Sequence, residues 1–363
     1  MPLAQPRHSA RLDTTSNQRE RRIAPVIERR ESAGTRAIGS LGLCLLLLLT
    51  GPGRPAAQDG EIASSTRSAP IYRLLPEESD AVTDLTTVVA PRFDQAETEI
   101  PRWEFLERHR LLITTLVPIA GLVVVTANSL IGYDTDHGFR VHHEGWFGAN
   151  TVNGGADKAS HLTDYFVVAS VFEDAYRILG HSEKTAILLG FGSALAAGLA
   201  NEVSDGFTRH GFSWEDFAMD AVGATTASLL SATHTRDLLG MRTSHIPGSS
   251  YTHDVYSADF KISGLGRRLG VNLGPLRWLL LSVTYSAKGY RVSPPIEQQR
   301  LVGFEVGLNL QQILNDVGVR RNTWWGYALH LFGDYVRFPY TAVGMRYDLN
   351  HGKWHGPNSG NYD

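Results

Sequence analysis

The sequence predicts an α+β protein: a membrane-associated helical bundle of about four helices, followed by a small antiparallel β-sheet. Two patterns lead to this fold class. Between residues 103 and 235, apolar side chains recur at the spacing of a helix. From Tyr256 onward, apolar and polar side chains alternate, which is typical of strands. A leucine run upstream of both regions adds the expectation that the chain is exported.

The composition excludes two classes of site. The 363 residues carry a formal net charge of −3, and no strongly basic region stands out, so no nucleic-acid partner is expected. Cys44 is the only cysteine, which excludes an intramolecular disulfide and a thiolate metal cage. No cofactor is expected from the sequence. Whether other side chains bind a metal is left open.

Residues 41–49 contain the leucine run, and arginines precede it. The run is typical of a signal-peptide core, and the small residues Pro55-Ala56-Ala57 predict cleavage near Gln58. An uncleaved anchor helix is the alternative, but the run is short for a full membrane span. Lipidation of Cys44 is not expected, because Leu43 precedes it where a small residue is required and the leucines follow it.

Composition and period divide the chain into four predicted segments. Residues 58–102 are rich in Pro, Ser, Thr and acidic groups and lack a sustained apolar period, which is typical of a linker. The expected segments are an N-terminal tail with signal peptide (1–57), a disordered linker (58–102), the helical bundle (103–240) and the antiparallel sheet region (250–363).

Four helices are expected in the bundle. The first, Leu111–Ile131, is long enough to cross about 30 Å of hydrocarbon at about 1.5 Å per residue. A polar loop over Asp134–Gly155 separates it from the second helix, Asp157–Leu179. The third helix is expected over Glu183–Asp205, and Ser213 begins the fourth. The last three helices have shorter apolar runs, so the bundle either spans the membrane or lies shallowly in it.

Small residues recur along the third and fourth predicted helices. Gly190, Ala194 and Gly198 are spaced four apart, and Gly223 and Ala227 repeat the pattern. Such spacing lets two helix backbones approach closely in lipid. We therefore expect the third and fourth helices to pack through these faces.

Polar side chains gather at the ends of the predicted helices. His161 lies near the start of the second helix, Glu202 and Asp205 lie near the end of the third, and Asp216 lies near the start of the fourth. In an up-down bundle these three ends meet, and Lys158 is close by. An imidazole beside carboxylates could act as an acid–base set or ligate a metal. His161, Glu202, Asp205 and Asp216 are the predicted catalytic residues.

A structural interpretation of the same residues stays open. Asp157 occupies a position typical of an N-cap, and Ser213 with Asp216 has the spacing of a capping box. Lys158 could pair with a nearby carboxylate, and His161 could be a buried core histidine. For the convergence of histidine and carboxylates, function and structure are both retained as hypotheses.

Three spaced motifs resemble a known family. The motifs are Gly155-Ala156-Asp157-Lys158-x-x-His161, Glu202-x-x-Asp205-Gly206-Phe207, and Gly211-Phe212-Ser213-x-x-Asp216 followed by Gly223-Ala224. Over residues 145–235 they resemble the YfiM-like family of predicted periplasmic lipoproteins, a domain of unknown function. They are more distantly similar to VanZ-like membrane proteins, which are linked to glycopeptide resistance. Asn201 and Asp220 depart from the family pattern, which commonly has lysine and asparagine there. The resemblance implies an envelope location and supplies no catalytic residues.

The C-terminal region predicts strands and one helix. Strict alternation occurs over 279–285, 302–310 and 343–349, and residues 322–335 predict a short aromatic helix. Aromatic residues near the strand ends are similar to those of outer-membrane strands. Because too few strands are present to close a barrel, a small sheet packed on the bundle or on the membrane surface is expected.

The sequence supports two hypotheses about function. The first is a non-catalytic component of the bacterial cell envelope, membrane-associated and facing the periplasm, with membrane lipid and another envelope protein as expected partners. The second is a membrane-embedded enzyme or lipid-binding protein that acts on a lipid-linked or cell-wall substrate through the His/Glu/Asp cluster. No nucleophile motif accompanies that cluster, so the first function is preferred.

Overall fold

The structure is a computed structural model that describes residues 108–130, 138–244, 251, 254–291 and 296–358. These residues belong to one compact unit, Ser32–Asp363. They form seven α-helices, one short 3-10 helix and six strands, with helices first and most strands later, which confirms the α+β class. The predicted signal peptide, its cleavage site and the predicted linker lie outside the described residues.

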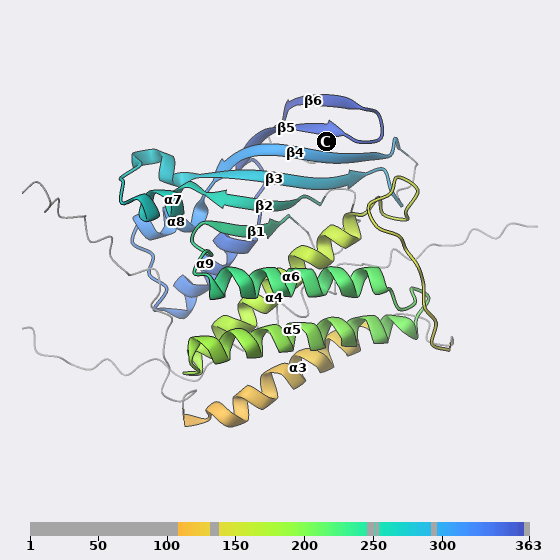
Figure 1. The fold of residues 1–363 in the computed structure, drawn as a ribbon, viewed down its shortest axis with the longest axis horizontal. Coiled ribbons are helices and arrows are strands. Elements are labelled where there is room, and N and C mark those ends of the chain that lie inside the picture. Colours follow the sequence, from red (N-terminus) through yellow and green to blue (C-terminus); the bar gives the residue numbers. More distant parts are fainter. Residues whose placement is uncertain (1–107, 131–137, 245–250, 252–253, 292–295, 359–363) are drawn as a thin grey trace, which may run out of the picture. The chain divides into compact units, whose positions relative to one another are not determined.

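Four helices form the bundle: α3 (Arg110–Leu130), α4 (Ala156–Ile178), α5 (Glu183–Gly206) and α6 (Trp214–Ala232). Their bounds agree closely with the prediction. As Figure 1 shows, they lie side by side on one side of the sheet. α4 packs against both α5 and α6, and α3 packs against α5. Aromatic and aliphatic side chains of α4 meet alanines of α5 and α6 in the core, so the small residues set the helix spacing.

One predicted cap is confirmed and one is wrong. The side chain of Ser213 accepts a hydrogen bond from the backbone nitrogen of Asp216, as expected of an N-cap. Asp157 does not cap α4. Gly155 occupies the N-cap position with φ 83°, a left-handed conformation that glycine adopts freely. Asp157 falls in the first helical turn instead, where its carboxylate pairs with Lys158.

The small residues of α5 and α6 pack closely on more than the one predicted partner helix. A Cβ added at Gly190 of α5 would lie 2.9 Å from the backbone nitrogen of Glu173 on α4. A Cβ added at Gly223 of α6 would collide with the carbonyl oxygen of Leu162, also on α4. Gly190 and Gly223 therefore pack closely on α4, the central helix, whereas a Cβ at Gly198 of α5 would lie 2.7 Å from the carboxylate of Asp220 on α6. The predicted packing of the third helix on the fourth is thus confirmed at Gly198, and α4 is a further partner of both small faces.

The six strands form one sheet in the order of the sequence, and every neighbouring pair is antiparallel. They are β1 (Leu239–Thr243), β2 (Tyr256–Lys261), β3 (Leu279–Lys288), β4 (Gln299–Leu308), β5 (Ala342–Asp348) and β6 (Lys353–Asn358). The predicted strands correspond to β3, β4 and β5, and the predicted aromatic helix is α9 (Trp324–Tyr335).

Several short elements of the C-terminal half were not predicted. They are β1, β2 and β6, α7 (Ile262–Leu269), the 3-10 helix η3 (Gly274–Trp278) and α8 (Leu310–Asp316). All of them are only five to eight residues long, too short for a helical or alternating period to stand out. β1 also places the start of the sheet at Leu239, upstream of the expected change of period at Tyr256.

The buried face of the sheet carries charges. Arg242 on β1 donates to Asp259 on β2 over 2.6 Å, and Ser282 on β3 donates to the same carboxylate over 2.6 Å. Arg346 on β5 donates to Glu305 on β4 over 3.1 Å. All five side chains belong to residues that are at most 4% exposed. Ion pairs between neighbouring strands therefore compensate the charged side chains that are buried on this face of the sheet.

The opposite face of the central strands is apolar and exposed. Cross-strand neighbours on β3, β4 and β5 make two adjacent rows, which we call the outer patch: Leu281, Val306 and Val343, and Val283, Phe304 and Met345. Each of these residues is 46–59% exposed. Apolar side chains thus face outward where the charged ones face inward.

Contacts at two places hold the bundle to the sheet. Next to the start of α4, the hydroxyl of Tyr285 donates to the carbonyl of Gly154, and small residues of α4 pack on tyrosines of the sheet region. Near the other end of α4, the hydroxyl of Tyr327 on α9 donates to Asp174 over 3.1 Å. The sheet therefore rests on the same helix that organises the bundle.

We predict opposite effects for alanine at two glycines of α5. Gly190→Ala should destabilise the protein by about 1–3 kcal/mol, because the new methyl group meets the backbone of α4, which cannot move aside. Gly192→Ala should stabilise it by about 0.5–1 kcal/mol, because no atom lies within 4 Å of that position. Thermal unfolding of both variants measures the difference, and equal melting temperatures would contradict the close packing of α5 on α4.

A second prediction concerns acid. Burial would raise the pKa of Asp334, but the charges of Lys261 and Arg321, at 3.0 and 2.8 Å, lower it to about 2. A depressed folded-state pKa stabilises the protein above the unfolded pKa of about 4, and this stabilisation is lost as the pH falls from about 4 to about 2. This pKa shift corresponds to a contribution of about 2 kcal/mol to the free energy of unfolding at neutral pH.

Urea unfolding of the parent and of Asp334→Asn at pH 7 and at pH 2.5 tests this prediction. The difference in unfolding free energy between the two proteins should be large at pH 7 and should shrink by about 2 kcal/mol in acid. A difference that does not change with pH would show that Asp334 is not held ionised by its two partners.

Candidate functional site

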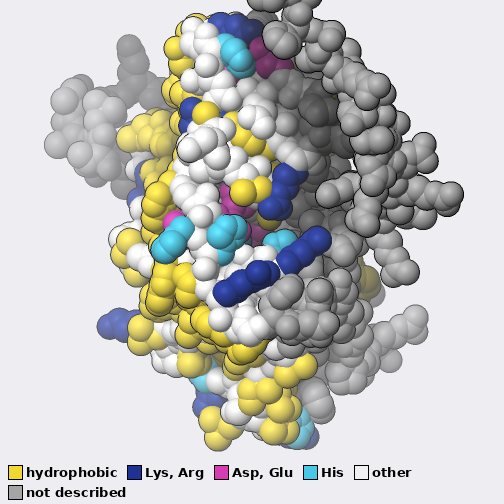
Figure 2. All heavy atoms as spheres, turned by 90° about the vertical axis from the view of Figure 1, so that its right-hand side faces the viewer, with side chains coloured by type: hydrophobic (Ala, Val, Ile, Leu, Met, Phe, Trp, Pro, Cys, Tyr) yellow, Lys and Arg dark blue, Asp and Glu magenta, His cyan; other side chains and the backbone are white. Residues whose placement is uncertain are grey.

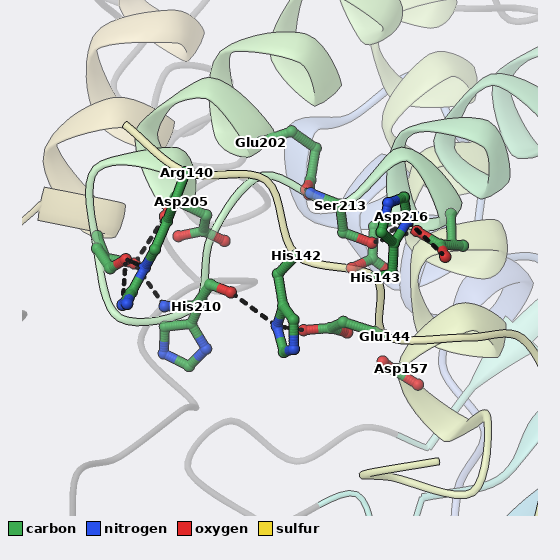
Figure 3. A network of polar contacts seen from close by, with 12 residues as sticks. Arg140, His142, His143, Glu144, Asp157, Glu202, Asp205, His210, Ser213 and Asp216 are labelled. Atoms are coloured by element: carbon green, nitrogen blue, oxygen red, sulfur yellow. Dashed lines mark hydrogen bonds and ion pairs between the residues drawn. The ribbon is translucent and has the colours of Figure 1, made fainter. Parts of the chain in front are cut away.

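Polar side chains converge at one end of the bundle, where α4 and α6 begin and α5 ends. The loop before α4 lies over this end and is held by backbone hydrogen bonds: Arg140 donates to Gly206, Phe212 donates to Arg140, and His142 donates to Phe212. Figure 3 shows this arrangement, with Glu144 of the loop placed beside Asp157. The loop therefore brings further side chains to the ends of the three helices.

The first of two clusters surrounds an ammonium group. The Nζ atom of Lys158 lies 2.6 Å from Asp216, 2.9 Å from Asp157 and 2.9 Å from Glu144. Lys158 is 0% exposed. Burial would lower the pKa of Lys158, but the three carboxylates raise it well above its ordinary value, so the ammonium stays charged. We call Lys158 with these three carboxylates the lysine cluster. It ties the loop, α4 and α6 together.

The second cluster surrounds an imidazole. Nδ1 of His161 lies 2.7 Å from Oδ1 of Asp220, and Nε2 lies 3.8 Å from Oδ1 of Asp216. One ligand atom each of His161, Glu202 and Asp220 lie within 4.8 Å of one another. We call these three residues the histidine cluster. Burial would lower the pKa of His161, but the carboxylates of Asp216 and Asp220 raise it well above its ordinary value.

Glu202 is held in place by the backbone at the start of α6. The backbone nitrogen of Ser213 donates to Oε2 over 3.1 Å, and the side chain of Asn201 donates to Oε1 over 3.2 Å. Burial raises the pKa of Glu202 to about 8, with His161 opposing the shift. Burial also raises the pKa of Asp220 to about 6, against the same imidazole. The site thus gathers more carboxyl groups than its cations neutralise.

The four predicted catalytic residues all lie at this end of the bundle. His161 contacts Asp216, and its ring comes close to the carboxylate of Glu202. Asp205 is near enough to raise the pKa of Glu202, but it does not belong to the histidine cluster. Its backbone oxygen accepts hydrogen bonds from Thr208 and Gly211, so Asp205 shapes the turn after α5. The catalytic role of the four residues stays a prediction.

Two residues of the site were not chosen from the sequence. Asp220 follows Asp216 by one helical turn, and this spacing is the sequence signal that could have placed it with His161. Glu144 lies in the loop, and no sequence pattern links it to the helices. It reaches Lys158 only because the loop folds back over the bundle.

Among the residues that the structure describes, two sets of side chains have the chemistry and spacing to hold a metal ion. They are the histidine cluster and the three carboxylates of the lysine cluster, Glu144, Asp157 and Asp216. Both sets offer oxygen ligands, and the histidine cluster adds an imidazole nitrogen. Without a metal, the same groups can share and transfer protons.

Comparison with known proteins identifies one family. Residues 143–232 match the model of a family described as a predicted periplasmic lipoprotein (DUF2279). The match covers α4, α5 and α6, and it contains every residue of both clusters. It supports the predicted resemblance to periplasmic lipoproteins of unknown function over almost the same stretch. No curated protein and no solved structure matches the chain.

We predict that Lys158→Met is strongly destabilising. The substitution keeps an unbranched side chain but leaves two buried carboxylates and a partly buried one without their shared cation, at an expected cost of about 3–5 kcal/mol. The double variant Lys158→Met/Asp216→Asn removes one of the surplus charges and should regain part of the loss. Chemical unfolding measures both variants. A single variant as stable as the parent would show that the ammonium does not hold the loop and helices together.

Proposed function

We propose that this chain, whose residues 143–232 match a family of periplasmic lipoproteins, is a non-catalytic component of the bacterial envelope whose apolar surfaces contact membrane lipid. The bundle would lie in or against the membrane, and the charged clusters would hold its fold together inside. The observation that carries the proposal is the outer patch, an exposed apolar face on a sheet whose other face is charged and buried.

The outer patch borders a cavity between the sheet and α6. This cavity has a volume of about 630 Å³ and is closed on the helix side by Thr226 and Leu230. Its lining includes all six residues of the outer patch. Sites for small organic ligands have volumes of about 300–1,000 Å³ and are mostly apolar. Acyl chains of lipid fit the size of this cavity and the apolar side chains of the outer patch that line it.

Exposed apolar side chains on the bundle give independent support. Several residues of α3 and α5 are 49–77% exposed, namely Leu111, Leu112, Leu116, Ile119, Val123 and Leu188. By length and composition, one helix among the described residues could cross a membrane, α5 (Glu183–Gly206). A core helix of a soluble protein meets the same criteria, so the exposure of these side chains is the stronger argument.

Charge is concentrated where lipid would not reach it. Figure 2 looks onto the polar end of the bundle, and histidine and basic side chains gather across its middle while hydrophobic ones lie below. The two clusters lie inside this end, with Lys158 and Asp220 both 0% exposed. A protein with charges paired inside and apolar side chains outside is suited to contact with lipid.

The family match supports the location. A periplasmic lipoprotein belongs to the envelope and faces the periplasm, and we extend this location to the present chain. The finer resemblances to YfiM-like and VanZ-like proteins remain part of the proposal. Cys44 lacks the sequence context of a lipidation site, so we propose that lipid contact arises from the folded surface.

An enzyme acting on a lipid-linked or cell-wall substrate is the second candidate. The hydrogen-bonded pair of His161 and Asp220 supports it, because general acid–base catalysis uses such pairs. Glu202 and Asp220 are 2% and 0% exposed, so a substrate would have to open the bundle to reach them. We rank this function second for that reason.

We predict that charge on the outer patch weakens lipid binding. Val343→Glu and Phe304→Glu should each lower the fraction of protein bound to phospholipid vesicles at least about tenfold, because a carboxylate must then be desolvated at the lipid contact. Val317→Glu is the matched control, because Val317 is 69% exposed but lies outside the patch. Vesicle flotation of the full chain gives the bound fractions. Unbound parent protein, or equal binding by all variants, would contradict the proposal.

A further inference from the structure

The two clusters at the end of the bundle differ in how their charges are balanced. In the lysine cluster, one ammonium lies within 2.9 Å of all three carboxylates. An ammonium has three donors, so it can satisfy one oxygen of each carboxylate at once. The position between these oxygens is taken by the side chain of Lys158. A metal ion would have to displace a fully buried group to bind there.

The histidine cluster has no lysine or arginine among its members. Its carboxylates, Glu202 and Asp220, come from α5 and α6, and His161 comes from α4. The side chain of His161 is 18% exposed, which gives a small ion a route from solvent. Imidazole nitrogen and carboxylate oxygen together form the ligand type that Zn²⁺ and its neighbours in the first transition series prefer.

One oxygen of Asp220 points to a ligand beyond the protein. Oδ1 contacts His161, but Oδ2 accepts no hydrogen bond from any residue that the structure describes. Asp220 is 0% exposed. A Cβ at Gly198 of α5 would lie 2.7 Å from Oδ2, so the absence of a side chain there makes room for this carboxylate beside α5. A buried carboxylate oxygen without a donor is costly unless a cation contacts it.

The spacing of the donors suits one ion. Ligand atoms of the three residues lie within 4.8 Å of one another. Around tetrahedral Zn²⁺, with bonds of about 2.0–2.2 Å, neighbouring ligands are about 3.3 Å apart. Small side-chain movements close that difference. Ser213 and Asn201 already fix Glu202 by hydrogen bonds to its two oxygens, as outer partners of metal ligands commonly do.

We propose that His161, Glu202 and Asp220 bind one divalent transition-metal ion, with Zn²⁺ as the best match to one nitrogen and two oxygen ligands. The ion joins α4, α5 and α6 at the end where all three meet, and it leaves one tetrahedral position for water. It places a metal cation between the carboxylates of the histidine cluster, where the lysine cluster has the ammonium of Lys158. The proposal is independent of whether the chain contacts lipid.

Equilibrium dialysis and calorimetric titration of the chelator-treated full chain test this site. Zn²⁺ should bind with one ion per chain and raise the melting temperature, while Mg²⁺, which disfavours imidazole, should do neither. His161→Gln and Asp220→Asn should each weaken Zn²⁺ binding by more than about tenfold, since losing even an outer partner of a metal ligand costs that much.

Asp205→Asn is the matched control. Asp205 is a buried carboxylate at the same end of the bundle, but it lies outside the ligand set, so Zn²⁺ binding should change less than about threefold. Glu144→Gln tests the lysine cluster in the same way and should also leave binding in place. Loss of Zn²⁺ binding in Asp205→Asn or Glu144→Gln equal to that in Asp220→Asn would overturn the assignment.

Circular dichroism spectra of each variant, recorded in the presence of chelator, show whether the variant still folds when no metal is bound. If Asp220→Asn does not fold, Glu202→Gln takes its place, because the amide keeps the shape and can still accept the hydrogen bond from Ser213. Cobalt substitution of the parent gives a readout that needs no variant, since the visible spectrum of Co²⁺ distinguishes tetrahedral ligation from solvated ion. A parent chain that binds no Zn²⁺ at micromolar concentration, or a His161→Gln variant that binds it normally, would refute the site.

Discussion

The buried ammonium of Lys158 is the contact on which this end of the molecule depends. Glu144 comes from the loop, Asp157 from α4 and Asp216 from α6, and Lys158 is the cation that all three carboxylates share. The contact therefore does more than join two helices. It fixes the loop over the bundle, and the loop in turn positions the turn between α5 and α6 through backbone hydrogen bonds.

The sheet likewise has paired charges on its buried face and apolar side chains on its exposed face. Arg242 with Asp259 and Arg346 with Glu305 satisfy its buried face, which leaves the apolar side chains of the outer patch to face away from it. A soluble protein would ordinarily arrange these faces the other way. The bundle and the sheet are different architectures, yet both avoid placing charge on the surfaces that we assign to lipid. This agreement between two unrelated elements is the main physical support for our proposal that the chain contacts lipid.

The histidine cluster shows how two neighbouring groups of carboxylates acquire different properties. Both lie at the same end of the bundle, and Asp216 contacts Lys158 and His161 alike. What separates them is the cation each one contains. A lysine brings a permanent charge and makes its cluster structural, whereas a histidine brings a nitrogen that can bind a proton or a metal. Burial raises the pKa of Glu202 to about 8, and the neighbouring carboxylates of Asp216, Asp220 and Asp205 act in the same direction.

The sequence by itself determined the α+β class, the bounds of the bundle helices, the longer strands and the convergence of His161, Glu202 and Asp216, because each follows from a period or spacing along the chain. It could not determine which carboxylate completes the cluster, since Asp205 and Asp220 are equally plausible on a helical wheel. Only the packing of α6 on α4 brings Asp220 to the imidazole. The sequence also did not predict that Glu144 contacts Lys158 or that the buried face of the sheet carries charged side chains. Alternation shows that a strand has two different faces, but it does not show which face is buried. Only the tertiary structure decides this, because a charged face can be buried only where residues from distant parts of the chain provide opposite charges beside it.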